Sequence, residues 1–159
     1  MWDDAHRAAK TTRQHKEANA YISNGLPEVA IFHRCPTTNL MLKVKFDWLR
    51  FDDEAVDLKT TLSTRPEKFA RQLNDLHYDC QQEFYKYVAL LSGITIKEFT
   101  FVATEYVHAD ICQPYNLSRA RSIRASDTVQ TGLKEMAECQ ETGVWYGWSK
   151  DDCTMTLVK

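Results

Sequence analysis

The segment from Leu42 to Trp48 alternates strictly between apolar and polar side chains, and it constrains the fold more than any other part of the chain. Successive side chains of a β-strand point to opposite faces, so the pattern predicts a strand with one apolar face: Leu42, Val44, Phe46 and Trp48. An acidic turn at residues 52–54 leads into a second short strand, Ala55 to Lys59, in which Val56 and Leu58 face the core. Paired as a hairpin, the two strands place three ionisable side chains on a shared polar face: Asp47, Asp57 and Lys59.

The rest of the chain predicts helices and further strands around this hairpin. A polar helix from Asp3 to about Ser23 is followed by Gly25, which we interpret as its C-cap. Ser63 or Thr64 is expected to cap a helix that has Pro66 in its first turn. The remaining elements are strands at residues 28–32, 99–104 and 109–115, two helical stretches that meet near residue 77, and a helix at 119–141 closed by Gly143.

The composition fits a single α/β domain over residues 1–159, with a mixed central β-sheet flanked by helices. The 20 Lys and Arg against 22 Asp and Glu give a formal net charge of −2, which neither indicates nor excludes a nucleic-acid partner. No apolar run is long enough to span a membrane, and we expect no secretory signal at the N-terminus. The five cysteines contain no C-x-x-C pair, which favours reduced thiols in the cytoplasm over a zinc or iron–sulfur cluster.

Asp47, Asp57 and Lys59 form a chemically coherent site on the predicted hairpin. Two carboxylates a few ångströms apart repel each other, and a hard divalent cation such as Mg²⁺ removes the conflict because it takes oxygen ligands. Such a cation activates water and stabilises charge on a phosphate, and a nearby ammonium orients the water. The pattern therefore indicates metal-assisted phosphodiester hydrolysis, with Glu28 at the edge of a third strand as a further carboxylate. A solvated polar face in a small structural domain is the alternative that this spacing leaves open.

Several motifs, in order along the chain, resemble the PD-(D/E)xK nuclease superfamily, specifically its exodeoxyribonuclease VIII (RecE-type) and lambda-type exonuclease branch. The first two are K-F-D-W-L at residues 45–49 and V-D-L-K-T-T at residues 56–61. Gln81 and Tyr85 then resemble the Q-x-x-x-Y motif of this branch. Further similarities lie at residues 25–28, 66–70, 101–105 and 143–148. Phe46 stands where many members of the superfamily have proline.

The resemblance implies a restriction-endonuclease-like core and assigns roles to particular residues. The implied metal ligands are three carboxylates and one main-chain carbonyl: Glu28, Asp47, Asp57 and the carbonyl of Leu58. Asp47 and Asp57 are thereby also catalytic residues, and Lys59 is the catalytic lysine. Gln81 and Tyr85 are similar to residues that steady the site and the nucleotide. The implied cofactor is Mg²⁺, for which Mn²⁺ can substitute.

The activity that the resemblance implies is a Mg²⁺-dependent deoxyribonuclease, an exonuclease that hydrolyses double-stranded DNA from an end in phage-type recombination. The implied partners are the DNA, further copies of the chain in a ring-like homo-oligomer, and a single-strand annealing protein. Two related interpretations stay open: another nuclease of the superfamily, Cas4-like or endonucleolytic, and a non-catalytic DNA-binding remnant of the fold. Relatives in this branch carry a longer N-terminal helical region.

Overall fold

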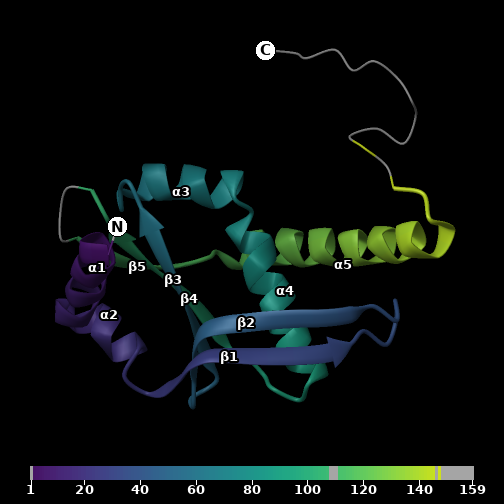
Figure 1. Ribbon diagram of the computed structural model, residues 1–159, viewed down its shortest axis with the longest axis horizontal. Helices are drawn as coiled ribbons and strands as arrows, with labels where there is room; N and C mark the ends of the chain where they lie inside the picture. Colours follow the sequence, from purple (N-terminus) through teal and green to yellow (C-terminus); the bar gives the residue numbers. More distant parts are fainter. Residues whose placement is uncertain (1, 108–110, 146, 148–159) are drawn as a thin grey trace, which may run out of the picture.

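The computed structural model describes residues 2–107, 111–145 and 147, and it places a β-sheet between two groups of helices (Figure 1). The elements follow in the order α1 (Trp2–Gln14), α2 (Lys16–Tyr21), β1 (Gly25–Arg34), β2 (Met41–Arg50), β3 (Glu54–Thr61), α3 (Pro66–Asp75), α4 (Tyr78–Leu91), β4 (Glu98–Glu105), β5 (Cys112–Asn116) and α5 (Arg119–Thr142). The prediction of an α/β fold with a mixed sheet is confirmed.

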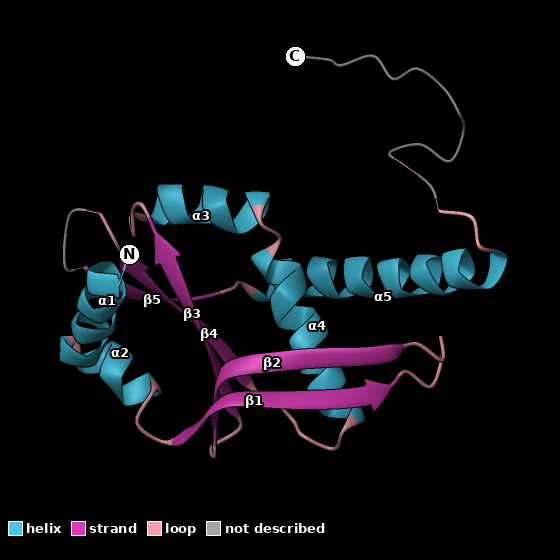
Figure 2. Ribbon diagram, in the orientation of Figure 1, coloured by secondary structure: helices cyan, strands magenta, loops and turns pink. Residues whose placement is uncertain are grey.

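The sheet has five strands in the order β1-β2-β3-β4-β5. β1 and β2 pair antiparallel, as do β2 and β3, whereas β4 runs parallel to β3 and β5 returns antiparallel to β4. A parallel pair needs a crossover connection, which α3 and α4 supply here (Figure 2). β2 and β3 pair at Trp48–Val56 and Leu49–Ala55 and then separate, so the sheet opens beside the predicted site.

Helices cover both faces of the sheet, and each face has its own hydrophobic cluster. The larger cluster lies under α3 and α4 and contains the alternating residues of β2 with partners from β4 and the helices: Leu42, Val44, Phe46, Phe99, Phe101, Phe69, Leu73, Val88 and Ala89. The smaller cluster lies under α2, where Val56 and Val102 pack with Ala18. The predicted apolar face is therefore correct except at Trp48, which packs in the smaller cluster because it is paired with Val56.

Polar contacts fix the two N-terminal helices against the sheet. Thr12 of α1 shares a 2.8 Å hydrogen bond with Thr104 of β4, and both side chains are buried. Arg50, at the end of β2, donates to the main-chain carbonyls of Ala20 and Tyr21 and so satisfies the C-terminal end of α2. α1 and α2 are thereby held as one wall over β4 and β5.

Two predictions about helix caps are wrong. Gly25 is the first residue of β1 rather than a C-cap, because α2 already ends with Ile22 as its C-cap. A side chain would not fit at Gly25, since a Cβ there would lie 2.4 Å from the main-chain oxygen of Leu49. The N-cap of α3 is Arg65.

Ser63 and Thr64 do not cap α3, because their polar groups form hydrogen bonds in the turn that precedes the helix. The main-chain N–H and the hydroxyl of Thr64 both donate to the Glu105 carboxylate, at 2.6 and 3.0 Å. Pro66 in the first turn of α3 and Gly143 at the end of α5 stand where the sequence predicts them. The N-terminal helix is interrupted at His15, whose ring accepts a hydrogen bond from the Ala18 N–H.

Within the described residues, no helix combines the length and the hydrophobicity that crossing a membrane requires. The four cysteines in this part of the chain are free thiols: Cys35, Cys80, Cys112 and Cys139. The fifth, Cys153, lies outside the described residues, as do the start of the predicted strand 109–115 and positions 146 and 148 of the aromatic segment.

Candidate active site

Three carboxylates lie on three neighbouring strands, next to the point where the sheet opens. Glu28 and Asp47 both fall between the β1–β2 pairs Pro27–Trp48 and Val29–Phe46, and Asp47 and Asp57 each lie one residue beyond the β2–β3 pair Trp48–Val56, where these two strands separate. Glu28 has a φ of 57°, an uncommon left-handed conformation for a residue with a side chain, and the β1–β2 ladder is interrupted at this position. We refer to Glu28, Asp47 and Asp57 as the carboxylate row.

Asp57, Lys59 and Gln81 converge on the face of the sheet that α3 and α4 cover. Lys59 Nζ lies 2.6 Å from Asp57 Oδ2 and donates to Gln81 Oε1 at 2.8 Å. The Gln81 amide nitrogen donates to Asp57 Oδ1 at 2.6 Å. Lys59 Nζ also lies 4.1 Å from the centre of the Tyr78 ring, a cation–π contact. Because Gln81 comes from the first turns of α4 and the other two residues from β3, the crossover through α3 assembles this Asp57–Lys59–Gln81 cluster.

Asp57 is the buried member of the carboxylate row, with 3% of its surface exposed. Burial raises the pKa of Asp57 above its ordinary value and the charge of Asp47 adds to this, whereas Lys59 and Gln81 act in the opposite direction. Asp57 Oδ2 forms an ion pair with Lys59 but receives no well-directed hydrogen bond from the described residues. A buried carboxylate oxygen with free acceptor capacity is suited to bind a cation.

The alternative interpretation, in which Asp57 and Lys59 lie on a solvated polar face, is wrong, because both side chains are enclosed. Parallel pairing sets Asp57 level with Phe101 of β4, which belongs to the larger hydrophobic cluster, so both charged side chains point toward α3 and α4. β3 is a central strand rather than one half of an exposed hairpin. Leu58, predicted to face the core, is 44% exposed and lines a cavity between β3 and α1.

Asp47 and Glu28 are held less tightly than Asp57. Asp47 Oδ2 accepts a 2.8 Å hydrogen bond from the main-chain N–H of Leu58, across the gap where β2 and β3 separate. Glu28 is ion-paired with Lys45 of β2, and the two side chains are 61% and 52% exposed. The hydrogen bond and charge of Glu28 raise the pKa of Lys45, and Asp47 contributes less. Each carboxylate of the row therefore has its own cationic or N–H partner.

A cavity of about 440 Å³ opens beside two members of the carboxylate row. Glu28 and Asp47 line it together with Lys59, and α1 supplies the opposite wall. Arg13 of α1 also lines the cavity, is exposed, and makes no ion pair within the part of the chain that the structure describes. Carboxylates on one side and a guanidinium on the other are chemically suited to a phosphate ester accompanied by a metal ion.

Tyr85 is the predicted catalytic residue that the structure places apart from the Asp57–Lys59–Gln81 cluster. Its ring packs edge-to-face against Phe46 with the centroids 5.2 Å apart, inside the larger hydrophobic cluster. Tyr78 and Arg13, in contrast, were not anticipated. Tyr78 precedes Gln81 by about one helical turn, which is a usable sequence signal, whereas Arg13 lies in a polar helix without a distinguishing pattern.

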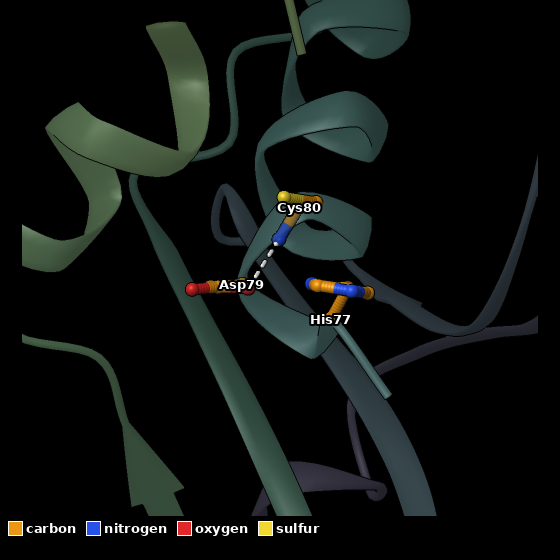
Figure 3. Close-up of side chains that lie close together, drawn as sticks. All are labelled: His77, Asp79 and Cys80. Atoms are coloured by element: carbon orange, nitrogen blue, oxygen red, sulfur yellow. Dashed lines mark hydrogen bonds between the residues drawn. The ribbon is translucent and has the colours of Figure 1, made fainter. Parts of the chain in front are cut away.

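A second group of possible metal ligands lies at the start of α4, where ligand atoms of His77, Asp79 and Cys80 are within 4.8 Å of one another (Figure 3). Both Asp79 oxygens are already engaged, since Oδ1 accepts from the Cys80 N–H at 2.9 Å and Oδ2 accepts from Arg121 at 2.9 Å. Burial and the Asp79 charge raise the pKa of the Cys80 thiol, which disfavours the thiolate that a metal needs. This group is therefore better explained as the contact that joins α4 to α5.

Comparison with protein families places these residues in a known context. Residues 2–154 match the model of a family described as a PDDEXK-like domain of unknown function (DUF3799). The chain belongs to this PDDEXK-like family. Within the PDDEXK-like domain, Asp47 and the run Asp57-Leu58-Lys59 have the residue types that the family description names. No curated protein sequence matches the chain.

The PDDEXK-like domain is also similar to solved structures. One is the crystal structure of a protein from Eubacterium rectale provisionally named an exonuclease, with a TM-score of 0.73 and 15% sequence identity. The similarity covers 99% of this chain and 62% of that one, so the chain spans less than two thirds of that protein. The crystal structure of SSO0001 has a TM-score of 0.43 at 14% identity, over 81% of this chain and 57% of that one, which is too low to argue from. The first similarity supports a restriction-endonuclease-like α/β fold.

Proposed function

We propose that this PDDEXK-like domain is a metal-dependent nuclease that hydrolyses the phosphodiester bonds of DNA. The observation that carries the proposal is the Asp57–Lys59–Gln81 cluster, in which residues from β3 and α4 hold a carboxylate and an ammonium in contact beside the carboxylate row. Groups fixed in this way need little rearrangement when charge develops on a phosphate, which is the main way that an active site lowers a barrier electrostatically.

The carboxylate row fits a hard divalent cation such as Mg²⁺, with Mn²⁺ as a substitute. Mg²⁺ is commonly bound by one or two carboxylates, together with waters and substrate phosphate. Asp47 and Asp57 each lie one residue beyond the Trp48–Val56 pair on adjacent strands, and Asp57 Oδ2 has free acceptor capacity. These two carboxylates and the Leu58 carbonyl would hold the ion, with Glu28 as a further ligand. A bound ion lowers the pKa of a water ligand and stabilises negative charge on the phosphate.

Lys59 is the proposed catalytic lysine. Asp57, Gln81 and the Tyr78 ring fix its ammonium, and Lys59 also lines the cavity. In this position the ammonium would orient the attacking water and offset charge on the phosphate as a compact point charge. Gln81 is a positioning residue, because it contacts both Asp57 and Lys59.

Arg13 and Tyr85 support the same site from greater distance. Arg13, on the opposite wall of the cavity, would bind a neighbouring phosphate of the strand. Tyr85 would support β2 next to Asp47 through its packing on Phe46.

The finer proposal is an exonuclease that degrades double-stranded DNA from an end, of the RecE-type and lambda-type branch, in phage-type recombination. Its support is the sequence resemblance around Asp47, Asp57-Leu58-Lys59 and Gln81, together with the fold similarity to the protein from Eubacterium rectale. The composition leads us to a single domain and the cysteine pattern to the cytoplasm, and the resemblance adds a homo-oligomer that works with a single-strand annealing protein. Light scattering of the purified chain tests the oligomer directly.

The test of the proposed function compares linear duplex DNA with covalently closed circular duplex, in Mg²⁺ and in EDTA. An exonuclease degrades only the linear DNA, an endonuclease cuts both, and a DNA-binding remnant cuts neither but still retards the DNA in a gel. Asp57→Asn should abolish cleavage and leave DNA affinity equal or higher, because it removes a negative charge near the phosphate. Cleavage by this variant at the parent rate would contradict the proposal.

A further inference from the structure

The ion pair between Lys45 and Glu28 stands at the rim of the cavity, at the outer end of the carboxylate row. Lys45 lies opposite Ala30 in the β1–β2 register, so Glu28 is its diagonal neighbour. The residue level with Glu28 is Asp47, which carries the same charge. Glu28 thus has a like charge beside it and an opposite charge on the diagonal, and its carboxylate binds Lys45.

The carboxylate row does not form one compact ligand group. Among the described residues, the set of three whose ligand atoms lie within 4.8 Å of one another is the group at the start of α4, and the row is not such a set. Asp57 and Asp47 are held by Lys59 and by the Leu58 N–H, which leaves Glu28 as the exposed carboxylate whose partner is easiest to exchange. Exposed ion pairs contribute little free energy, so a divalent ion can compete with Lys45 for Glu28.

We propose that Lys45 is an exchangeable counter-ion of the metal site: it holds Glu28 until a divalent cation replaces it, and it thereby sets the affinity of the site for that cation. The inference rests on the proposed function, because it takes the carboxylate row as the metal site. Replacement of Lys45 by an uncharged residue removes both the competitor for Glu28 and a repelling positive charge, so the cation binds more tightly.

The experiment is calorimetric titration of the purified chain with Mn²⁺ alone, without DNA, on the parent protein and on Lys45→Met. The expected result is a dissociation constant about three- to fivefold lower in Lys45→Met, the range expected for removing one exposed pair. Lys43→Met is the matched control. Lys43 lies two residues earlier on the same strand and is exposed, but its ammonium lies over the Phe32 ring, 5.3 Å from the centroid, rather than at the row. Its Mn²⁺ affinity should equal that of the parent.

The Glu28→Gln background separates the specific pair from a general charge effect. Lys45→Met should tighten Mn²⁺ binding in the parent and have little effect in Glu28→Gln, because the neutral amide neither pairs with Lys45 nor binds the ion as a carboxylate does. High salt should shrink the difference, since both side chains are exposed.

Three results overturn the inference. Equal Mn²⁺ affinities of Lys45→Met and the parent show that Lys45 does not compete for Glu28. Equal tightening of Mn²⁺ binding by Lys43→Met shows only a general charge effect, and so does an undiminished effect of Lys45→Met in the Glu28→Gln background. In each of these the parent still binds Mn²⁺, so the proposed function survives. Absence of Mn²⁺ binding by the parent at millimolar concentration overturns both proposals together.

Discussion

Two lysine–carboxylate pairs flank the same part of the sheet, and they differ in burial rather than in chemistry. In the Lys59–Asp57 pair the side chains are 15% and 4% exposed, and Gln81 and Tyr78 enclose them. In the Lys45–Glu28 pair the side chains are 52% and 61% exposed. The enclosed pair is held in one arrangement and suits a fixed catalytic role, whereas the exposed pair can be exchanged for another ion.

The sharpest test of this difference is the effect of each lysine on DNA cleavage. Lys59→Met should lower turnover on linear duplex by about 10²-fold or more, because it removes one preorganised electrostatic contact. Lys45→Met should stay within a few-fold of the parent at saturating Mg²⁺. The measurement is initial rates on end-labelled duplex. Equal losses of turnover from the two substitutions would show that the two lysine–carboxylate pairs do not differ in their roles.

The two lysine substitutions should also differ in their effect on the stability of the fold, with the larger loss again at Lys59. Lys59→Met leaves the Asp57 carboxylate buried without its cation, so we expect a loss of about 3–5 kcal/mol in the free energy of unfolding. Lys45→Met should cause no measurable loss, because its partner remains in water. Urea denaturation of both variants measures this. An unchanged midpoint for Lys59→Met would indicate that water reaches Asp57 in solution.

Substitutions at two residues of α4, Gln81 and Tyr85, test which side chains around Lys59 affect turnover. Gln81→Ala removes the amide that binds both Asp57 and Lys59, and it should reduce turnover about tenfold with little change in KM. Tyr85→Phe keeps the ring against Phe46 and should be close to the parent in rate. A larger loss from Tyr85→Phe than from Gln81→Ala would assign the hydroxyl a direct role at the site.

The smallest expected effect is the pH dependence of stability at Asp57. Burial raises the folded-state pKa of Asp57 above the ordinary value of the unfolded chain, so at neutral pH ionisation of Asp57 lowers the stability of the fold. Compared with Asp57→Asn, which does not ionise there, the parent should therefore gain stability as pH is lowered from the folded pKa of Asp57 toward its ordinary value, and should show no such gain at higher pH. Thermal unfolding across this interval measures the difference. Asp75→Asn, on the exposed side of α3, controls for the loss of one negative charge.

The sequence allowed prediction of most of the elements, because periodicity depends on local order along the chain. The alternation from Leu42 to Phe46 and the apolar spacing of the helices are examples. The burial of Asp57 was not predicted, because it depends on the parallel pairing of β3 with β4, which no local pattern encodes. The contact of Gln81 with Asp57 was suggested by family resemblance alone.

The pair of Lys45 and Glu28 was beyond the reach of sequence reasoning for a different physical reason. It depends on the β1–β2 register, which sets Lys45 opposite Ala30 and so makes Glu28 its diagonal neighbour. Arg13 reaches the cavity only because α1 docks on β4, and a polar helix gives no sign of which neighbour it will contact.

The parallel pairing of β3 with β4 also determines when the site can appear during folding. β3 meets β2 at two residue pairs but is aligned with β4 along its whole length, from Glu54–Glu98 to Thr61–Glu105. A nascent chain that has emerged only as far as α4 already contains Asp47, Asp57, Lys59 and Gln81, yet it lacks the strand that sets their orientation. Because such long-range pairing closes a large loop, it is intrinsically slow. The residues of the site are thus synthesised before the strand that brings them into their working arrangement.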